Sequence, residues 1–189
     1  MNRRDALERV ALILGGTVIG GAAFLQGCKN PSEKAAAFSL SQDQIAFLDE
    51  VAETIIPTTN TPGAKAALVG AFMNTMVTDC YKEKDQKIFA AGITEIDNSS
   101  NHMFGKGFMN ISPAQRTSLL NQVNKELKAY NDIKKEDDPA HYFGMMKQLT
   151  LLGYFSSEIG ATQALRYVAI PGKYEGCVPY KKGDKAWAT

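Results

Sequence analysis

The stretch SQDQIAFLDEVAETIIP, residues 41–57, carries the start, the buried face and the end of one helix. Ser41 and Gln44 form a capping box, the pattern in which each side chain binds the backbone N–H of the other residue. The apolar residues that follow recur at the spacing of a single helical face: Ile45, Leu48, Val51, Ala52 and Ile55. Pro57 ends the helix because it has no backbone N–H. The stretch therefore predicts an amphipathic helix that packs one face on the rest of a domain.

Apolar periodicity predicts four further helices, at residues 64–81, 82–98, from 113 past 127, and 139–157. The last two begin at a capping side chain followed by proline, Ser112-Pro113 and Asp138-Pro139. The segments 58–64 and 98–110 are rich in Thr, Asn, Ser and Gly and are expected to connect helices. No stretch alternates with a period of two for long enough to predict a sheet. The predicted fold is all-α, a compact bundle of five helices with 162–168 as a short sixth, followed by an irregular C-terminal tail.

The first 38 residues are expected to lie outside this domain. Arg3 and Arg4, an apolar run from 10 to 25 and the LQGC stretch ending at Cys28 are typical of a bacterial export signal. The run is about 16 residues long, shorter than the ~20 apolar residues of a membrane-spanning helix. We interpret 1–27 as a twin-arginine signal for folded cargo, Cys28 as the lipidated first residue of the mature protein, and 28–38 as a flexible tether. Export as an unfolded chain and an uncleaved anchor remain the alternatives.

The remaining residues, 39–189, are enough for one compact domain. The net charge of the chain is +1 and 22% of its residues are charged, so no basic field is available to hold nucleic acid. With Cys28 lipidated, Cys80 and Cys177 are left, and the periplasm permits disulfides. They either form a bridge between the tail and the helices, or remain two thiols with one buried in a helix.

The residues able to do chemistry do not converge in a recognisable motif. His102 is expected in a loop, and His141 at the surface or bonded to a carboxylate. A zinc site of both histidines with the two cysteines is chemically allowed, but no metal-binding spacing supports it. The acidic run at Glu136, Asp137 and Asp138 is better explained by capping of a helix start than by acid–base chemistry. We therefore expect no catalytic, cofactor-binding or metal-binding residues in this chain.

Several stretches together resemble the gluconate 2-dehydrogenase subunit 3 family, over about residues 40–187. They are AETIIP at 52–57, TPGA at 61–64, LTLLGYF at 149–155, ALRY at 164–167, and Pro171-Gly172 with Cys177. The resemblance implies a small, non-catalytic subunit of a membrane-associated sugar or polyol dehydrogenase. It implies that FAD and the active site belong to a large partner of the glucose-methanol-choline oxidoreductase type, with a cytochrome c as a further partner.

The leading hypothesis is thus a periplasmic, lipid-anchored accessory subunit that supports folded export, assembly and membrane attachment of a flavoprotein. A small subunit of a glucoside 3-dehydrogenase, a free-standing lipoprotein scaffold and a small zinc hydrolase are the competing hypotheses. The resemblance gives Pro57, Pro62 and Gly63 a structural role in the first loop. Gly153 indicates a close approach, either to another helix of this chain or to a partner backbone.

Aromatic residues gather near the C-terminus, where five of the seven tyrosines follow residue 140. Tyrosine and tryptophan supply much of the binding energy at protein interfaces. The residues expected to contact a partner are Tyr154, Phe155, Tyr167, Tyr174, Tyr180 and Trp187. The alternative is that these side chains cover the core of their own domain, since tyrosine is often half-buried.

Overall fold

A computed structural model describes residues 38–170, 172–173 and 175–188, and in this part of the chain the fold is all-helical, as predicted. The elements are α2 (Gln42–Ile55), α3 (Val69–Cys80), α4 (Glu83–Phe104), the 3₁₀ helix η1 (Phe108–Asn110), α5 (Pro113–Ile133), α6 (Tyr142–Ser156) and the π-helix η2 (Gly160–Ala164). No strand is found in the described ranges, and the one β-bridge joins Arg166 to Trp187. Arg3, Arg4 and Cys28 fall outside them, so the signal and the tether stay predictions.

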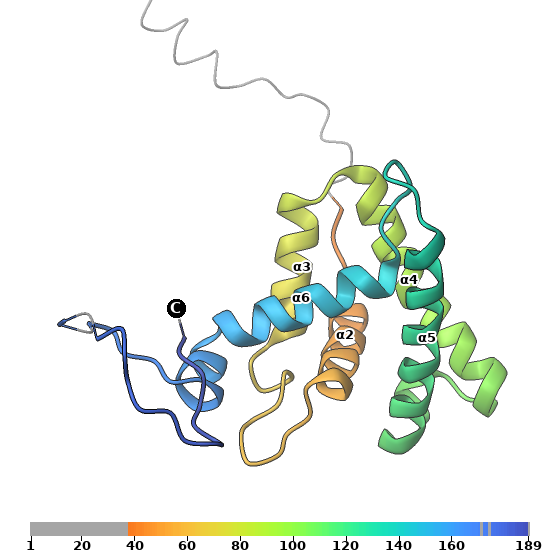
Figure 1. Cartoon of the computed structure of the whole chain (residues 1–189). Helices are drawn as coiled ribbons and strands as arrows, with labels where there is room; N and C mark the ends of the chain where they lie inside the picture. Colours follow the sequence, from red (N-terminus) through yellow and green to blue (C-terminus); the bar gives the residue numbers. More distant parts are fainter. Residues whose placement is uncertain (1–37, 171, 174, 189) are drawn as a thin grey trace, which may run out of the picture. The chain divides into compact units, whose positions relative to one another are not determined.

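Two helices, α2 and α6, organise the core. Each of them contacts all the other α-helices, and Figure 1 shows α6 running across α2 and α3. Both capping boxes form as the sequence predicts, with Ser41 and Gln44 starting α2 and Ser112 and Gln115 starting α5. Fully buried apolar side chains from every α-helix meet between them, among them Leu48, Met73, Phe89, Leu119 and Met146.

The loop between α2 and α3 is held against α2 by the carboxylate of Glu53. This group accepts hydrogen bonds from the backbone N–H and the hydroxyl of Thr58, both at 2.8 Å, and from the N–H of Lys65 at 3.0 Å. The Thr58 hydroxyl in turn accepts from the N–H of Gly63. Burial raises the pKa of Glu53, but these donors outweigh it and hold the pKa below its ordinary value. The structural role predicted for this loop agrees with these contacts.

Helix α3 begins at Val69, five residues later than predicted. Leu68 adopts a left-handed backbone with φ of 54° just before α3, so a helix cannot run without a break from residue 64 into α3. The periodicity of the sequence continues through this segment and does not reveal the break, or the contacts of Lys65 with Glu53 and of Gly70 with Asp49 that hold the segment against α2.

Helix α4 extends to Phe104, beyond the predicted end at 98. The added turn is polar in sequence, but Ser100 is buried in it and its hydroxyl donates to the Lys106 carbonyl at 2.8 Å. This serine is therefore compatible with a packed helix. Gly105, with φ of 68°, ends the helix in the left-handed conformation that glycine adopts readily. His102 therefore lies in the last turn of α4, and the prediction of a loop for it was wrong.

Helix α6 begins at Tyr142, three residues later than predicted, and Asp138 is not its cap. The Asp138 carboxylate accepts the N–H of Lys135 at 2.8 Å and closes a turn. The capping acceptor is instead Nδ1 of His141, 3.2 Å from the N–H of Phe143. Burial lowers the pKa of His141, which keeps this nitrogen free to accept, while the nearby Glu126 carboxylate opposes the shift.

The predicted helix at 162–168 is replaced by the shorter η2, which ends at Ala164. The N–H of Leu165 donates to the Gly160 carbonyl at 2.9 Å, and the backbone of Leu165 itself is extended. Arg166 then pairs through its backbone with the segment around Trp187, at N···O distances of 2.7 and 2.9 Å. A helix cannot continue through a residue whose N–H and C=O bind another segment.

An ion-pair cluster joins α2 to α5 and η1. Glu50 pairs with Arg116 and Lys65, and only 16% and 14% of the Glu50 and Arg116 side chains are exposed. Arg116 also donates to the carbonyls of Phe108 and Met109 at 3.1 and 2.9 Å. Burial raises the pKa of Glu50, but the two cations outweigh it and hold the pKa below its ordinary value. Arg116 thus ties three separate elements together.

The close approach indicated by Gly153 is a crossing within this chain. A Cβ placed on Gly153 would lie 2.6 Å from Cδ1 of Phe72, which belongs to α3. Non-bonded carbon atoms do not approach each other this closely. With the Phe72 ring in this position, α3 and α6 can cross here only because residue 153 has no side chain. The partner-backbone alternative is not needed to explain this glycine.

We predict that Gly153→Ala lowers the free energy of unfolding by about 1–3 kcal/mol, because the added methyl overpacks the crossing. In a Phe72→Ala background the same substitution should instead stabilise by up to about 1 kcal/mol, since alanine favours a helix over glycine. Urea unfolding of the four proteins measures both effects. Equal effects in the two backgrounds would contradict the crossing.

Candidate partner interface

Helix α6 exposes an apolar surface, which we call the α6 outer face and define by Leu151, Leu152 and Phe155. These side chains are 43%, 49% and 41% exposed. The opposite side of α6 is buried in the core through Phe143, Met146 and Leu149, among others. Its sequence, YFGMMKQLTLLGYFS, has a single charged residue, so neither side of the helix is strongly polar.

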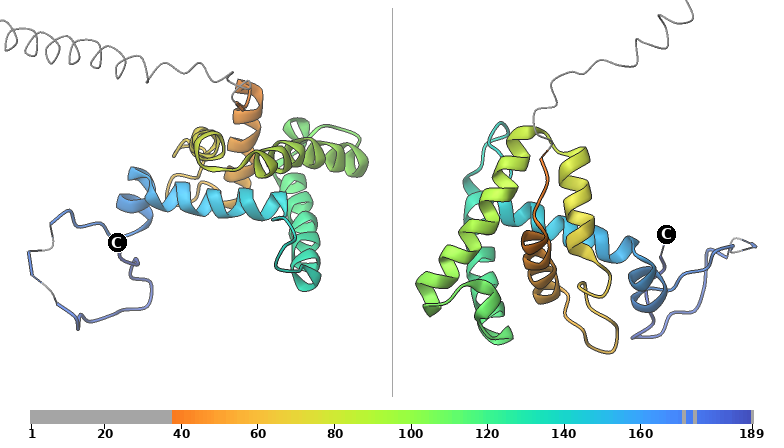
Figure 2. Two further views of the ribbon diagram at one scale, coloured as in Figure 1. Left: turned by 90° about the horizontal axis from the view of Figure 1, so that it is seen from above. Right: turned by 180° about the vertical axis from the view of Figure 1, so that it is seen from behind.

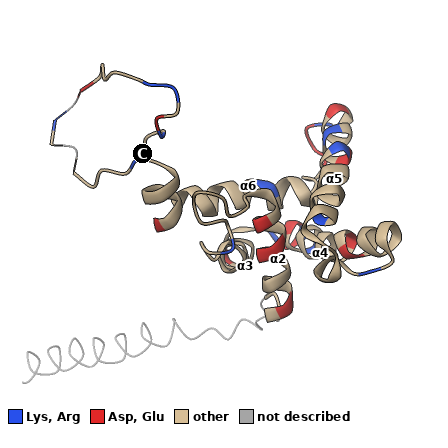
Figure 3. Ribbon diagram, turned by 90° about the horizontal axis from the view of Figure 1, so that it is seen from below, with Lys and Arg blue, Asp and Glu red and all other residues tan. Residues whose placement is uncertain are grey.

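A helix that is apolar all round is normally covered all round. Here the other helices cover one side only, and Figure 3 shows that the charged residues of the helices gather on α2, α4 and α5, with one blue segment on α6. Covering one large apolar side chain is worth about 1.5–3 kcal/mol. Exposed apolar patches of this kind mark binding surfaces. The α6 outer face therefore has the properties of a surface that another protein covers.

Tyr154, which the sequence assigned to the interface, lies in the core of its own domain. Its side chain is 2% exposed, and its hydroxyl donates to the Pro62 carbonyl at 2.7 Å. For this residue the structure supports the alternative that the ring covers the chain's own core. The next residue, Phe155, is 41% exposed and belongs to the α6 outer face, although the edge of one ring of the pair meets the face of the other at a centroid distance of 5.2 Å. Successive residues of a helix lie about 100° apart, so one of the pair is buried and the other is not.

The second exposed apolar segment is the C-terminal arm, which we define as residues 165–188. It leaves η2 as an extended loop and returns to it, as Figure 2 shows. At its base the Arg166 guanidinium lies 4.5 Å from the centre of the Trp187 ring, and the Lys185 ammonium binds the Gln163 carbonyl. The base thus combines backbone hydrogen bonds with a cation–π contact, and the loop is closed upon itself.

Between its two ends the arm makes few contacts with the helices. Ile170 and Tyr180 are 85% and 76% exposed, and Tyr167, Val178 and Trp187 are also exposed. Tyr174 lies outside the described residues. Tyr167, Tyr180 and Trp187 are thus accessible, and their contact with a partner stays a prediction.

The two cysteines in the described ranges are free and exposed in this structure. Cys80 ends α3 and Cys177 lies in the arm. The structure thus has two separate thiols, the alternative to the bridge, although neither of them is buried as that alternative supposed.

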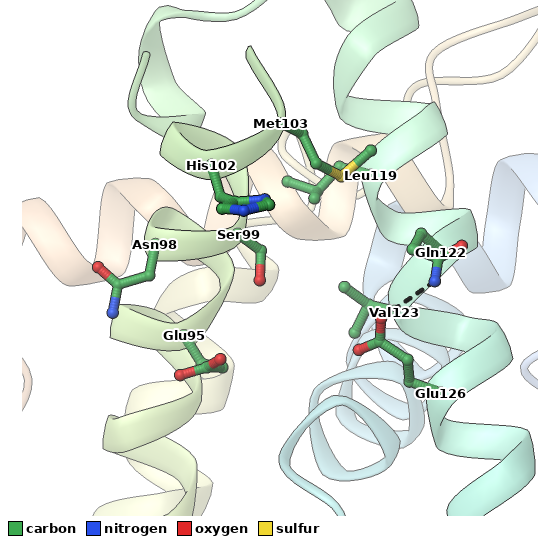
Figure 4. Close-up of a pocket in the computed structure, with 9 residues that line it drawn as sticks. All are labelled: Glu95, Asn98, Ser99, His102, Met103, Leu119, Gln122, Val123 and Glu126. Carbon is green, nitrogen blue, oxygen red and sulfur yellow. Dashed lines mark hydrogen bonds between the residues drawn. The ribbon is translucent and has the colours of Figure 1, made fainter. Parts of the chain in front are cut away.

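A groove with a volume of about 660 Å³ lies between α4 and α5. In Figure 4, Glu95 and His102 lie on the α4 wall, and Gln122 and Glu126 on the α5 wall, where the Gln122 amide donates to the Glu126 carboxylate at 3.2 Å. Burial raises the pKa of the neighbouring Tyr142 to about 12, and the Glu126 and Glu95 carboxylates add to this shift. The Tyr142 hydroxyl therefore stays protonated at neutral pH.

The groove and its surroundings contain no cluster suited to a metal. Across residues 38–170, 172–173 and 175–188, no three His, Cys, Asp or Glu side chains converge as metal ligands would. His102 and His141 lie on different helix ends, and neither is paired with a cysteine. The same part of the chain has no helix that is both long enough and apolar enough to span a bilayer.

We predict that Trp187→Ala speeds amide hydrogen exchange at Arg166 and Ala188 about two- to five-fold. Loss of an exposed cation–π contact, worth about 0.5–1 kcal/mol, makes local opening of the base more frequent. Exchange rates of the two amides by NMR measure the effect, and Tyr180→Ala, an exposed arm residue away from the base, is the control. Equal rates in both variants would show that the ring does not hold the arm closed.

Comparison with protein families gives one match. The family model described as Gluconate 2-dehydrogenase subunit 3 matches residues 42–172, from the start of α2 into the arm. No curated protein and no solved structure matches the chain. The match covers more than half of the chain and includes the α6 outer face.

Proposed function

The chain belongs to the gluconate 2-dehydrogenase subunit 3 family, and on this premise we propose that it attaches the catalytic flavoprotein of a sugar dehydrogenase to the membrane. Membership makes it a subunit 3-type accessory subunit of a multi-subunit dehydrogenase complex. Its proposed tasks are to accompany the flavoprotein through folded export, to support assembly of the complex and to hold it in the periplasm. A small subunit of a glucoside 3-dehydrogenase would perform the same tasks for another substrate.

The observation that carries this proposal is the α6 outer face. Leu151, Leu152 and Phe155 lie together on one side of a helix whose other side forms the core, and each is about half exposed. In a subunit of a complex, the partner would bury these side chains on assembly. The proposed partner is the large subunit of the glucose-methanol-choline oxidoreductase type, which would hold FAD and the active site. A cytochrome c is the further partner proposed for electron transfer.

The N-terminal residues support the export and anchoring tasks. Arg3 and Arg4 fit a signal for folded cargo, and such a signal suits a complex whose flavoprotein must bind FAD before export. Cys28 would carry the lipid that keeps the complex at the membrane. On this proposal one signal serves two chains.

We predict that replacing Leu151, Leu152 and Phe155 together by serine weakens binding of the flavoprotein at least about ten-fold, because buried anchors of an interface are lost. The isolated variant should still unfold in a single cooperative urea transition, with a lower midpoint, since about half of each side chain packs on its own domain. Ile133→Ser, which changes an 80% exposed apolar residue at the end of α5, is the matched control. Binding is measured between the two purified subunits, and a triple variant that binds like the control would contradict the proposal.

Replacing Arg3-Arg4 by Lys-Lys tests the export task separately. The variant should leave the flavoprotein's dehydrogenase activity in the cytoplasm, because the partner has no signal of its own on this proposal. Activity is assayed in periplasmic, membrane and cytoplasmic fractions with sugar and glucoside substrates, which also separates the two candidate substrate classes. Unchanged export of the flavoprotein would contradict the shared signal.

A further inference from the structure

Lys147 is the one charged residue of α6, and its surroundings are unusual for a lysine. The side chain is partly buried between α6 and α5, and its ammonium donates to Oδ1 of Asn124 at 2.9 Å. Within the described residues, no carboxylate lies at ion-pair distance from it. A neutral amide compensates only part of the hydration that a partly buried ammonium loses. The Lys147 ammonium can therefore bind an anion in addition to the Asn124 amide.

A hollow of about 180 Å³ lies beside this ammonium. Its polar lining comes from three helices: Thr54 of α2, Thr117, Asn121 and Asn124 of α5, and Lys147 of α6. We call this hollow the Lys147 socket. A water molecule takes up about 30 Å³ in the liquid, so the socket is large enough for a carboxylate with its adjoining methylene.

Donors for an anionic occupant come from Lys147 and the amides of the lining, and not from its threonines. The hydroxyls of Thr54 and Thr117 already donate to the carbonyls of Glu50 and Pro113, at 2.7 and 3.0 Å, so they have no proton left for an occupant. Asn124 uses its oxygen toward Lys147, which leaves its NH₂ group as a donor, and Asn121 adds a second amide. An ammonium with two amide NH₂ groups matches the oxygens of a carboxylate.

The Lys147 socket lies near the α6 outer face along the helix. Lys147 lies four residues before Leu151, which places it one helical turn away on the same side of α6. At the other end of α6 the arm carries five Lys and Arg against two Asp and Glu, whereas residues 38–164 carry eleven against fifteen. The apolar face is thus flanked by positive charge at both ends, on a domain that is otherwise acidic.

We propose that the Lys147 socket binds a carboxylate side chain of the flavoprotein subunit, and that the subunit surface facing α6 is apolar at its centre and acidic at its margins. This inference rests on the proposed function. The carboxylate sets the register of the two subunits along α6, because the apolar contacts of Leu151, Leu152 and Phe155 tolerate sliding and an ion pair with Lys147 does not. The arm meets the remaining acidic groups.

The test is Lys147→Met, which keeps the apolar stem of the side chain and removes the charge, with Lys125→Met on the exposed side of α5 as the matched control. The dissociation constant between each full-length variant and the purified flavoprotein is measured at several salt concentrations. Lys147→Met should raise it about 30-fold or more and flatten its salt dependence, because truncating one partner of a buried ion pair removes a strong contact. Lys125→Met should change it less than two-fold. The unfolding midpoint of the isolated Lys147→Met protein should be equal to or above that of the wild type, which a purely structural role would not allow.

The outcomes separate the two proposals. If the wild type binds the flavoprotein and both lysine variants bind equally well, the socket assignment is wrong and the proposed function stands. If Lys147→Met leaves this affinity unchanged but abolishes binding to phosphatidylglycerol vesicles, the anion is a lipid phosphate and the assignment is also overturned. If the wild type itself does not bind the flavoprotein, the proposed function fails and the assignment fails with it.

Discussion

The structure depends on the need to cover α6, a helix with almost no polar surface. Four helices of the chain pack against it, and its crossing with α3 is so close that residue 153 must be glycine to admit the Phe72 ring. The next residue, Tyr154, extends this contact by binding the Pro62 carbonyl with its hydroxyl. The loop before α3 is thereby held at two points, by Tyr154 from α6 and by Glu53 from α2. Core packing and loop conformation thus depend on α6 together with α2.

The same constraint leads to the proposed function. The chain has enough helices to cover one side of α6, and the α6 outer face stays in water. The positive charge lies at both ends of this face, in Lys147 and in the C-terminal arm, while most other charge is carried by α2, α4 and α5. An apolar centre with charged margins is the usual arrangement of a protein interface. For an accessory subunit of a dehydrogenase complex, such a surface and a membrane anchor are the parts it needs.

Most of the helices could be predicted from local sequence, and the interface only in part. The capping boxes at Ser41 and Ser112 are short-range signals, and both were confirmed. The boundaries that were wrong depend on contacts between distant residues, such as that of Glu53 with Lys65 at the start of α3. Among the interface residues, sequence could not separate Tyr154 from Phe155, because both are aromatic neighbours on an apolar helix. Sequence reasoning did not identify Lys147. Its distinguishing feature is that no carboxylate of the described residues pairs with it, and only the packed structure shows this.

The sequence by itself determined that this protein is a helical domain of the gluconate 2-dehydrogenase subunit 3 family, because helix periodicity, caps and motifs are properties of neighbouring residues. The tertiary structure decided which side of α6 is left uncovered and which charges stand beside it. The physical reason is that apolar residues surround α6 on every side, so its sequence carries no information about orientation. Only the packing of α2, α3, α4 and α5 selects the side that remains for a partner.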